Sequence, residues 1–347
     1  MGDEQVIDPS GNTQISRPPT RFQQVMDVMF RRLCYGIAWL SVLLVVFIVL
    51  KIAVAATPAL RQQGLGFLTG TTWDPNTGQF GILPEIWGTL YTSWLALIIG
   101  TAFGVAAAIF LNEGFLAQSV FRILKVFGLE FHPLFGKLPD QIEGLLKNLI
   151  ELLAAIPSVV YGLWGLFVVI PFIRPMCNWL NLKLGWIPFF GTTLTGPGLL
   201  PAVIVLSIMV LPTITVISRD ALAAVPSKLR MAAYGMGATR WETILAVILP
   251  TAARGIVGAV VLAFGRALGE TMALAMLVGN ANRMSLSLFS PANTLAALLA
   301  NNFPEAAKND VAVLMYAALV LLAITLLVNI IGSIMLERAS SGQEGGK

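Results

Sequence analysis

Two charged residues, Arg266 and Glu270, lie inside a long apolar run at residues 255–278. Four residues apart, they would share one face of a helix. A charge at the centre of a bilayer costs at least roughly 2.5–3.5 kcal/mol, so each side chain should face a partner or a cavity. The planar guanidinium of Arg266 suits an oxyanion. Glu270 would hold that guanidinium in place and would accept a hydrogen bond from a protonated oxygen of the anion. Two interpretations stay open: an anion site on a transport path, or a structural ion pair between membrane spans.

Glycines flank this pair on the same helix. Gly265 and Gly269 would allow a neighbouring helix to approach closely. The order along the chain, with Arg266 before Glu270, is the less favourable one for an isolated helical ion pair. Simple support of the helix is therefore a weak explanation for the two charges.

A second pattern is a polar, glycine-punctuated segment at residues 230–250, between two apolar runs. Pro226 and Ser227 are typical of a helix start, and a short helix is predicted at 228–236. Gly237 permits a bend, and a second short helix at 241–249 would be closed by Pro250. Two short helices at an angle form a compact knob that can seat in a groove of another protein. An ordinary amphipathic loop at the membrane interface is the alternative.

The composition indicates which solvent surrounds these elements. The chain has 347 residues, of which 56% are hydrophobic and 12% charged, with a mean hydropathy of +0.80, whereas soluble domains are about 25% charged. We therefore predict an all-α membrane protein with six transmembrane helices, each long enough for a hydrocarbon core of roughly 30 Å. Pro212, Gly265 and Gly269 should interrupt the fourth and fifth spans. The predicted spans are 33–56, 89–111, 149–170, 199–217, 255–278 and 311–336.

Lysine and arginine set the expected orientation. They gather at residues 17–32, 122–147, 219–254 and 338–347, and they are sparse in the other connections. Both termini and the 230–250 segment should therefore be cytoplasmic. The same rule accounts for the net charge of +4, so nucleic acid is not an expected partner.

Four regions follow from these spans. They are a cytoplasmic tail at 1–32, the first span with an outer loop at 33–88, a core at 89–336 that contains the polar loop at about 226–250, and a cytoplasmic tail at 337–347. Residues 1–20 are polar and should be disordered. The first span has no cleavage motif near it and should be a retained anchor.

The connections carry further expectations. The inner loop at 112–148 contains a possible amphipathic helix at 116–127, and the outer loop at 171–197 is either partly re-entrant or an interfacial aromatic belt. Glu151 should be a solvated carboxylate at the start of the third span, which Pro157 and Gly162 should kink. His132 should be a solvated loop residue.

Several classes of protein are excluded by residues that are missing from the sequence. No G-x-x-x-x-G-K-[ST] motif occurs, because Gly136-Lys137 and Gly346-Lys347 lack the pattern. A single histidine, His132, leaves no hydrolytic triad and no histidine-rich metal site. Cys34 and Cys177 are too far apart in sequence to indicate a disulfide framework. We expect no enzyme activity and no cofactor, so ATP hydrolysis, if it drives this protein, takes place in another chain.

The segment at 230–250 resembles the cytoplasmic EAA loop of ABC-importer permeases, which docks into the ATPase subunit. The consensus is E-A-A, three residues, Gly, nine residues, Ile-x-Leu-Pro. Met231 stands where the Glu is usual, so a polar contact made by that Glu is absent here. Val247 and Leu249 fit the apolar end of the motif. The resemblance implies that these residues couple to the ATPase: Ala232, Ala233, Gly237, Ala238, Thr239 and Pro250.

Other motifs are similar to those of phosphate ABC permeases of the PstC type, over most of residues 67–278. The resemblance implies a type I importer permease fold in a prokaryotic plasma membrane, with Arg266 and Glu270 on the phosphate path. It also implies a second homologous permease chain, two ATPase subunits and an extracytoplasmic phosphate-binding protein, docked on 57–88 and 171–197. The PstA-type partner shares part of these motifs. A molybdate or sulfate permease and a secondary transporter stay open as alternatives, although the internal repeats typical of the latter are not seen. The motifs lie at 67–84, 88–90, 108–113, 151–165 and 265–272.

Overall fold

The computed structural model describes residues 20–75, 77–115 and 138–344. The chain divides into two compact units, Met1–Val54 and Ala55–Lys347. In its described part the first unit is a single helical segment, the beginning of α1. The second unit holds the remaining elements and all of the hydrophobic clusters.

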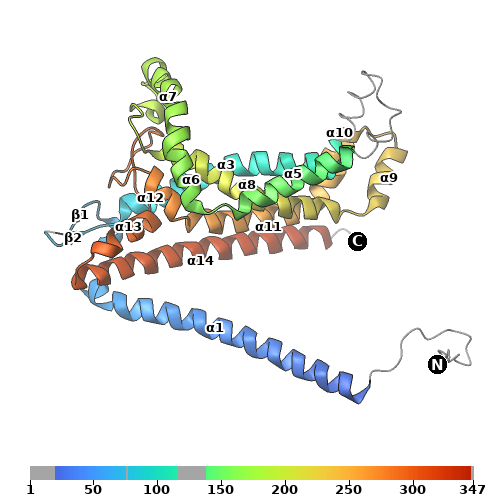
Figure 1. Ribbon diagram of the computed structural model, residues 1–347, viewed down its shortest axis with the longest axis horizontal. Coiled ribbons are helices and arrows are strands. Elements are labelled where there is room, and N and C mark those ends of the chain that lie inside the picture. Colours follow the sequence, from blue (N-terminus) through green and yellow to red (C-terminus); the bar gives the residue numbers. More distant parts are fainter. Residues whose placement is uncertain (1–19, 76, 116–137, 345–347) are drawn as a thin grey trace, which may run out of the picture. The chain divides into compact units, whose positions relative to one another are not determined.

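Helices dominate the described residues, and one short antiparallel hairpin pairs Trp73 with Phe80 (Figure 1). The helices are α1 (Arg21–Gln63), α2 (Gly66–Thr69), α3 (Leu83–Asn112), α5 (Leu138–Ala155), α6 (Ser158–Trp164), α7 (Ile170–Leu184), α8 (Leu199–Ala223), α9 (Ser227–Gly235), α10 (Arg240–Thr243), α11 (Leu249–Leu268), α12 (Met272–Leu277), α13 (Leu295–Asn302) and α14 (Lys308–Glu344). Shorter elements are the strands β1 (Trp73–Asp74) and β2 (Gln79–Phe80), the π-helical turns η1 (Gly165–Val169) and η3 (Ile244–Ile248), and the 3₁₀ turns η2 (Pro188–Phe190) and η4 (Phe303–Glu305).

Six helices among the described residues are long and apolar enough to cross a membrane, which confirms the predicted number of spans. Four of them contain or closely match the predicted runs. These spans are Arg21–Gln63, Leu83–Asn112, Ser158–Leu184, Leu199–Ala223, Arg240–Leu268 and Asp310–Glu337.

The third span was placed too early in the sequence. Residues 149–155 belong to α5, which ends at Ala155, and the spanning helix starts at Ser158 after the cap residue Pro157. Proline removes a hydrogen bond from a helix interior but is well suited to the position just before a helix. The span then runs through η1 into α7, so Pro171 does not end it. The first part of the predicted outer loop at 171–197 is therefore helix, up to Leu184. Glu151 is exposed on α5.

Close packing of α3 against α8 forms the centre of the second unit. A Cβ atom at Gly100 would lie 2.6 Å from a methyl carbon of Val210, and one at Gly104 would lie 2.9 Å from Ile214. The hydroxyl of Thr215 donates to the carbonyl of Gly104 at 3.2 Å. Small residues at such contacts let membrane helices pack without a gap. Helix α11 covers α8, and α14 packs along α11 (Figure 1).

Smaller clusters close the two ends of this helix layer. At the end that carries the β hairpin, the Phe67 ring stacks on Tyr316 of α14 with a 4.6 Å centroid separation. At the opposite end, Ala108 of α3 meets Leu222 of α8 and Ile244 of η3 in a second buried cluster. Figure 1 shows β1, β2 and α13 at one end of this unit, and α9 and α10 at the other.

Prolines and glycines act differently from the predictions at several points. Pro212 lies inside α8 without ending it. Gly162 lies within α6, where a Cβ atom would be 2.7 Å from the Met276 sulfur, so its lack of a side chain permits close contact with α12. Gly265 packs against Asn329 of α14 as expected, with 3.0 Å between a built Cβ atom and the Asn329 oxygen. His132 and the possible helix at 116–127 lie outside the described residues.

Candidate functional site

The segment at about residues 226–250, which is expected to dock on an ATPase subunit (the docking segment), begins with the nine-residue helix α9. This helix ends in a Schellman motif. The Ala238 amide donates to the Ala233 carbonyl at 3.1 Å, and the Gly237 amide donates to Tyr234 at 3.0 Å. Gly237 has φ +87°, in the left-handed region that glycine adopts without a steric penalty. The predicted first helix and its glycine bend are confirmed.

A capping box starts the second helix immediately after this bend. The Thr239 hydroxyl accepts from the Glu242 amide, and the Glu242 carboxylate accepts from the Thr239 amide at 2.7 Å. The two orphan amides of the helix start are therefore satisfied reciprocally. Only two residues, Gly237 and Ala238, separate the C-cap Met236 from the N-cap Thr239, so the angle between the helices is set by local hydrogen bonds.

The second helix does not stop at Pro250, contrary to the prediction. It runs from Arg240 through η3 and α11 to Leu268 as one span. Pro250 lies in the first turn of α11, directly after the π-helical turn. Proline has no amide hydrogen to donate, and a π-helical turn shifts the hydrogen-bond ladder at this point. The docking knob is therefore one short helix joined to the beginning of a membrane span.

The predicted coupling residues divide into a surface group and a packing group. Ala232, Gly237, Thr239 and Pro250 are exposed, and Ala238 is half-buried. Ala233 is only 2% exposed, so it holds α9 against the rest of the protein. The apolar side chains of Met231 and Met236 are exposed beside the first group. Met231, at the position of the usual Glu, therefore belongs to the same free surface.

An ion pair that was not predicted attaches this segment to another span. Arg230 Nη1 donates to Glu113 Oε1 at 2.8 Å, and Arg230 Nη2 donates to the Leu222 carbonyl at 2.9 Å. The Glu113 side chain is only 6% exposed, and Glu113 is the C-cap residue of α3, with its backbone amide donating to the Ile109 carbonyl. Glu113 closes one of the quoted family motifs at 108–113, but nothing in the sequence identified Arg230 as its partner.

Aromatic stacking strengthens the same junction. The Phe115 ring stacks on Trp241 with centroids 5.2 Å apart, and the Arg240 guanidinium lies 4.3 Å from the centre of the Phe115 ring. Such contacts add roughly 0.5–1.5 kcal/mol each at partly exposed positions. The docking segment is thus fixed to the neighbouring ends of α3 and α8 by side-chain contacts.

Arg266 and Glu270 do not share a helical face. Arg266 is in the last turn of α11, the helix ends at Leu268, and Glu270 lies in the break before α12. The Glu270 carboxylate accepts from the Ala273 amide at 3.4 Å, at the start of α12. Each charge therefore sits at the helix end that favours its sign. No ion pair joins the two side chains in the described part of the protein.

Thr213 on α8 contributes the one hydrogen bond that the Arg266 side chain makes within the described residues. Arg266 Nη1 donates to the Thr213 hydroxyl at 3.4 Å. The Arg266 side chain is exposed on the surface of this single chain, and Glu270 is half-buried. Most of the five guanidinium donors are therefore free to meet an acceptor. Thr213 could not be predicted from the sequence, because the contact between α8 and α11 joins residues far apart along the chain.

Comparison with known proteins agrees with these features. A family model described as binding-protein-dependent transport system inner membrane component matches residues 135–341. The phosphate transport system permease protein PstC of Mesorhizobium japonicum is 37% identical over 318 residues, covering 90% of each chain. The protein of the same name from Haemophilus influenzae is 36% identical over 321 residues, covering 91% of this chain and 95% of its own.

A solved structure supports the arrangement of the helices. The crystal structure of a bacterial ABC transporter involved in the import of the acidic polysaccharide alginate contains a chain with a TM-score of 0.56 to this one. The match covers 91% of this chain and 98% of that chain at 16% sequence identity. At this identity the likeness shows a shared fold and carries nothing about the transported molecule.

Proposed function

Because this chain belongs to the family of binding-protein-dependent transport system inner membrane components, we propose that it imports inorganic phosphate as one permease subunit of an ATP-driven transporter. It is an inner-membrane protein with six spans and the type I ABC importer permease fold. The observation that carries phosphate as the substrate is the similarity, along nearly the whole chain, to two phosphate permeases.

The docking segment supports the coupling to ATP. Exposed apolar side chains, Met231 and Met236 among them, border a knob whose angle is fixed by the Gly237 and Thr239 caps. An ATPase subunit would bind this knob, and its movement would pass directly into the membrane because α10 continues into α11. Coupling through Ala232, Gly237, Ala238, Thr239 and Pro250 is part of this proposal, whereas Ala233 acts from within the packing.

Arg266 is the residue proposed to meet phosphate. Its guanidinium offers several donors beyond the one used by Thr213, and a planar fork of donors matches two phosphate oxygens. Glu270, two residues past the end of α11, would accept a hydrogen bond from a protonated phosphate oxygen. Sulfate is fully ionised near neutral pH and cannot make that donation, so the arrangement favours phosphate.

The complete transporter would contain four further subunits. A second homologous permease would cover the exposed surface of Arg266 and complete the path, and two ATPase subunits would bind on the cytoplasmic side, where both termini also lie. An extracytoplasmic phosphate-binding protein would deliver the substrate. ATP-driven closure of the ATPase dimer would move the docking knobs together and switch the path from inward- to outward-facing. Because the binding protein supplies most of the selectivity, a weak and transient site at Arg266 is sufficient.

Uptake of labelled phosphate tests this proposal. The chain is co-expressed with its partner subunits in cells that lack high-affinity phosphate uptake, beside an ATPase variant that binds ATP without hydrolysing it. We expect uptake with the active ATPase only, and no inhibition by excess sulfate or molybdate. Inhibition by either anion would reassign the substrate to another oxyanion. Uptake that is unchanged with the inactive ATPase would identify a secondary transporter and overturn the proposal.

A further inference from the structure

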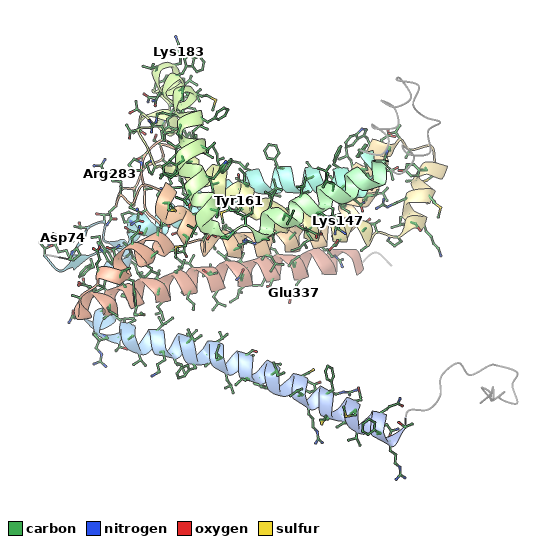
Figure 2. All side chains as sticks on the ribbon, viewed as in Figure 1. Asp74, Lys147, Tyr161, Lys183, Arg283 and Glu337 are labelled. Atoms are coloured by element: carbon green, nitrogen blue, oxygen red, sulfur yellow. The ribbon has the colours of Figure 1, made fainter. Side chains whose placement is uncertain are left out.

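A polar recess opens at the end of the second unit that carries the β hairpin. Its volume is about 600 Å³, and five asparagines and two threonines make up most of its lining. Figure 2 shows Asp74 and Arg283, which neighbour its lining residues in sequence, at this end of the protein. Most ligand pockets of this size are lined largely by apolar side chains, so the amide-rich lining is unusual. The lining residues are Thr71, Thr72, Trp73, Asn280, Asn282, Asn293, Leu298, Asn301 and Asn302.

The recess is far from the docking segment. Helix α3 begins beside it, where the Leu83 amide donates to the Gly70 carbonyl at 3.0 Å. The same helix has 30 residues, about 45 Å at 1.5 Å per residue, and it ends at the Glu113 that pairs with Arg230. If the docking segment faces the ATPase in the cytoplasm, the recess faces the extracytoplasmic side, where the binding protein arrives.

An anion does not fit this recess. None of its lining side chains carries a positive charge. Behind its floor lies Glu85, which is fully buried, and whose carboxylate accepts from Asn293 Nδ2 at 3.5 Å. This carboxyl group supplies no positive charge that could balance phosphate. The recess is therefore not a waiting site for the transported anion.

A metal ion fits no better. Hard cations need several free oxygen ligands, but two of the asparagine oxygens here are already in use. The Asn293 side-chain oxygen accepts from the Thr294 amide at 2.9 Å, and the Asn282 oxygen accepts from Asn293 Nδ2 at 3.4 Å. These bonds hold Asn282 and Asn293, the floor of the recess, in place. The exposed lining residues at its rim are left to bind a ligand or a partner.

The rim offers neutral groups that both donate and accept. Thr71, Thr72 and Asn301 are exposed, and their side chains make no hydrogen bond within the described residues. Peptide groups and uncharged polar side chains present the same mixture of donors and acceptors. A short polar loop of a protein thus matches the recess, and the absence of charge on its lining means that binding should depend little on salt.

We propose that this recess receives an uncharged, polar loop of the extracytoplasmic binding protein. The inference rests on the proposed function, because that function supplies the partner. It narrows the predicted docking loop at 57–88 to residues 71–73, and it adds residues 280–302 in place of the predicted loop at 171–197. The rim residue Asn301, at the end of α13, is the position where a substitution acts on the contact alone.

The test measures the dissociation constant between the labelled binding protein and the complete transporter in lipid nanodiscs. Asn301→Trp fills the recess, and Asn301→Leu keeps a similar volume but removes the hydrogen bonds. Gln79→Trp places the same bulk on the exposed edge of the hairpin, outside the lining. We expect about a tenfold loss of affinity for the Trp variant and a severalfold loss for the Leu variant. The control should change affinity less than about twofold, and the losses should be equal at about 0.05 M and 0.5 M salt.

Other outcomes separate this inference from the proposed function. Normal affinity in both Asn301 variants, or an equal loss in Asn301→Trp and Gln79→Trp, would overturn the recess as the docking site. In both of these cases, phosphate uptake by the wild-type transporter would leave the proposed function in place. A wild-type transporter that neither binds the protein nor transports phosphate would overturn both. Size-exclusion chromatography confirms that each variant complex is assembled before affinity is measured.

Discussion

Arg266 owes its chemistry to incomplete hydrogen bonding. Only Thr213 uses one of its donors among the described residues, over a long 3.4 Å contact. Arg266→Lys keeps the charge but replaces a planar fork with a point charge. We therefore expect phosphate uptake to fall by about tenfold or more, equivalent to about 1.4 kcal/mol of lost stabilisation, while the amount of assembled complex stays unchanged. Uptake of labelled phosphate and the yield of purified complex measure the two quantities.

A charge-swapped variant is the control for this interpretation. In Arg266→Glu with Glu270→Arg, a purely structural ion pair would be re-formed and uptake would return. Because Arg266 lies in α11, Glu270 lies in the break after it, and no ion pair joins the two side chains in the described part of the protein, we expect no recovery. Recovery of uptake in the swapped variant would contradict the assignment of Arg266 to the phosphate path.

At the scale of elements, the docking knob depends on one backbone conformation. Gly235 and Gly237 both have open space around a built Cβ atom, but only Gly237 has a positive φ, +87°. Gly237→Ala should therefore strain the bend by roughly 1–2 kcal/mol and reduce transport-coupled ATP hydrolysis. Gly235→Ala should be neutral or should stabilise α9 by about 0.5–1 kcal/mol. ATP hydrolysis by the reconstituted complex, measured with and without the loaded binding protein, checks both.

Equal loss of coupled hydrolysis in the two alanine variants would contradict this account, because the backbone angle would then not be the cause. Loss in the Gly235 variant alone would instead indicate a close contact between that face of α9 and the ATPase. Basal hydrolysis by the isolated ATPase subunits should be the same throughout.

Local patterns predicted most elements, but they did not reveal two π-helical turns or the side-chain contacts between residues far apart in sequence. The helix start at Pro226–Ser227 and the bend at Gly237 could be predicted, because a few neighbouring residues determine where a helix begins and ends. Pro171 and Pro250 were misread as helix ends because each follows a π-helical turn that an apolar sequence does not reveal. The contacts of Arg230 with Glu113 and of Arg266 with Thr213 join residues far apart in sequence. No periodicity encodes such pairs, so the sequence identified Arg266 but not its neighbour.

At the scale of the whole molecule, the two ends of the second unit should face different compartments. In a background of Cys34→Ser and Cys177→Ala, single cysteines replace Met236, which is 83% exposed on the docking segment, and Leu182, which is 83% exposed at the end of α7. We expect a membrane-impermeant maleimide to label position 182 in intact cells and position 236 only after the cells are opened. Cys177 is fully buried in the core, so its replacement by the smaller Ala is the background change to check for lost uptake.

Labelling of position 236 in intact cells would reverse the orientation drawn from lysine and arginine. It would also separate the docking segment from ATP, so the proposed coupling would fail with it. If neither cysteine reacts in opened cells, partner subunits cover both sites. Both cysteines should then react in the purified single chain.

Because the helix from Arg240 to Leu268 is continuous, the number of residues between Thr239 and Arg266 determines how the Arg266 side chain is oriented relative to the docking segment. Each residue of a helix advances it by about 1.5 Å and turns it by about 100°. Adding or removing one residue would therefore aim the guanidinium at a different neighbour while leaving the knob seated in its groove. A docking segment exchanged between related permeases would therefore transmit movement only when the number of residues between it and Arg266 is kept. The non-helical stretch between α12 and α13 could change length without rotating Arg266 relative to the docking segment.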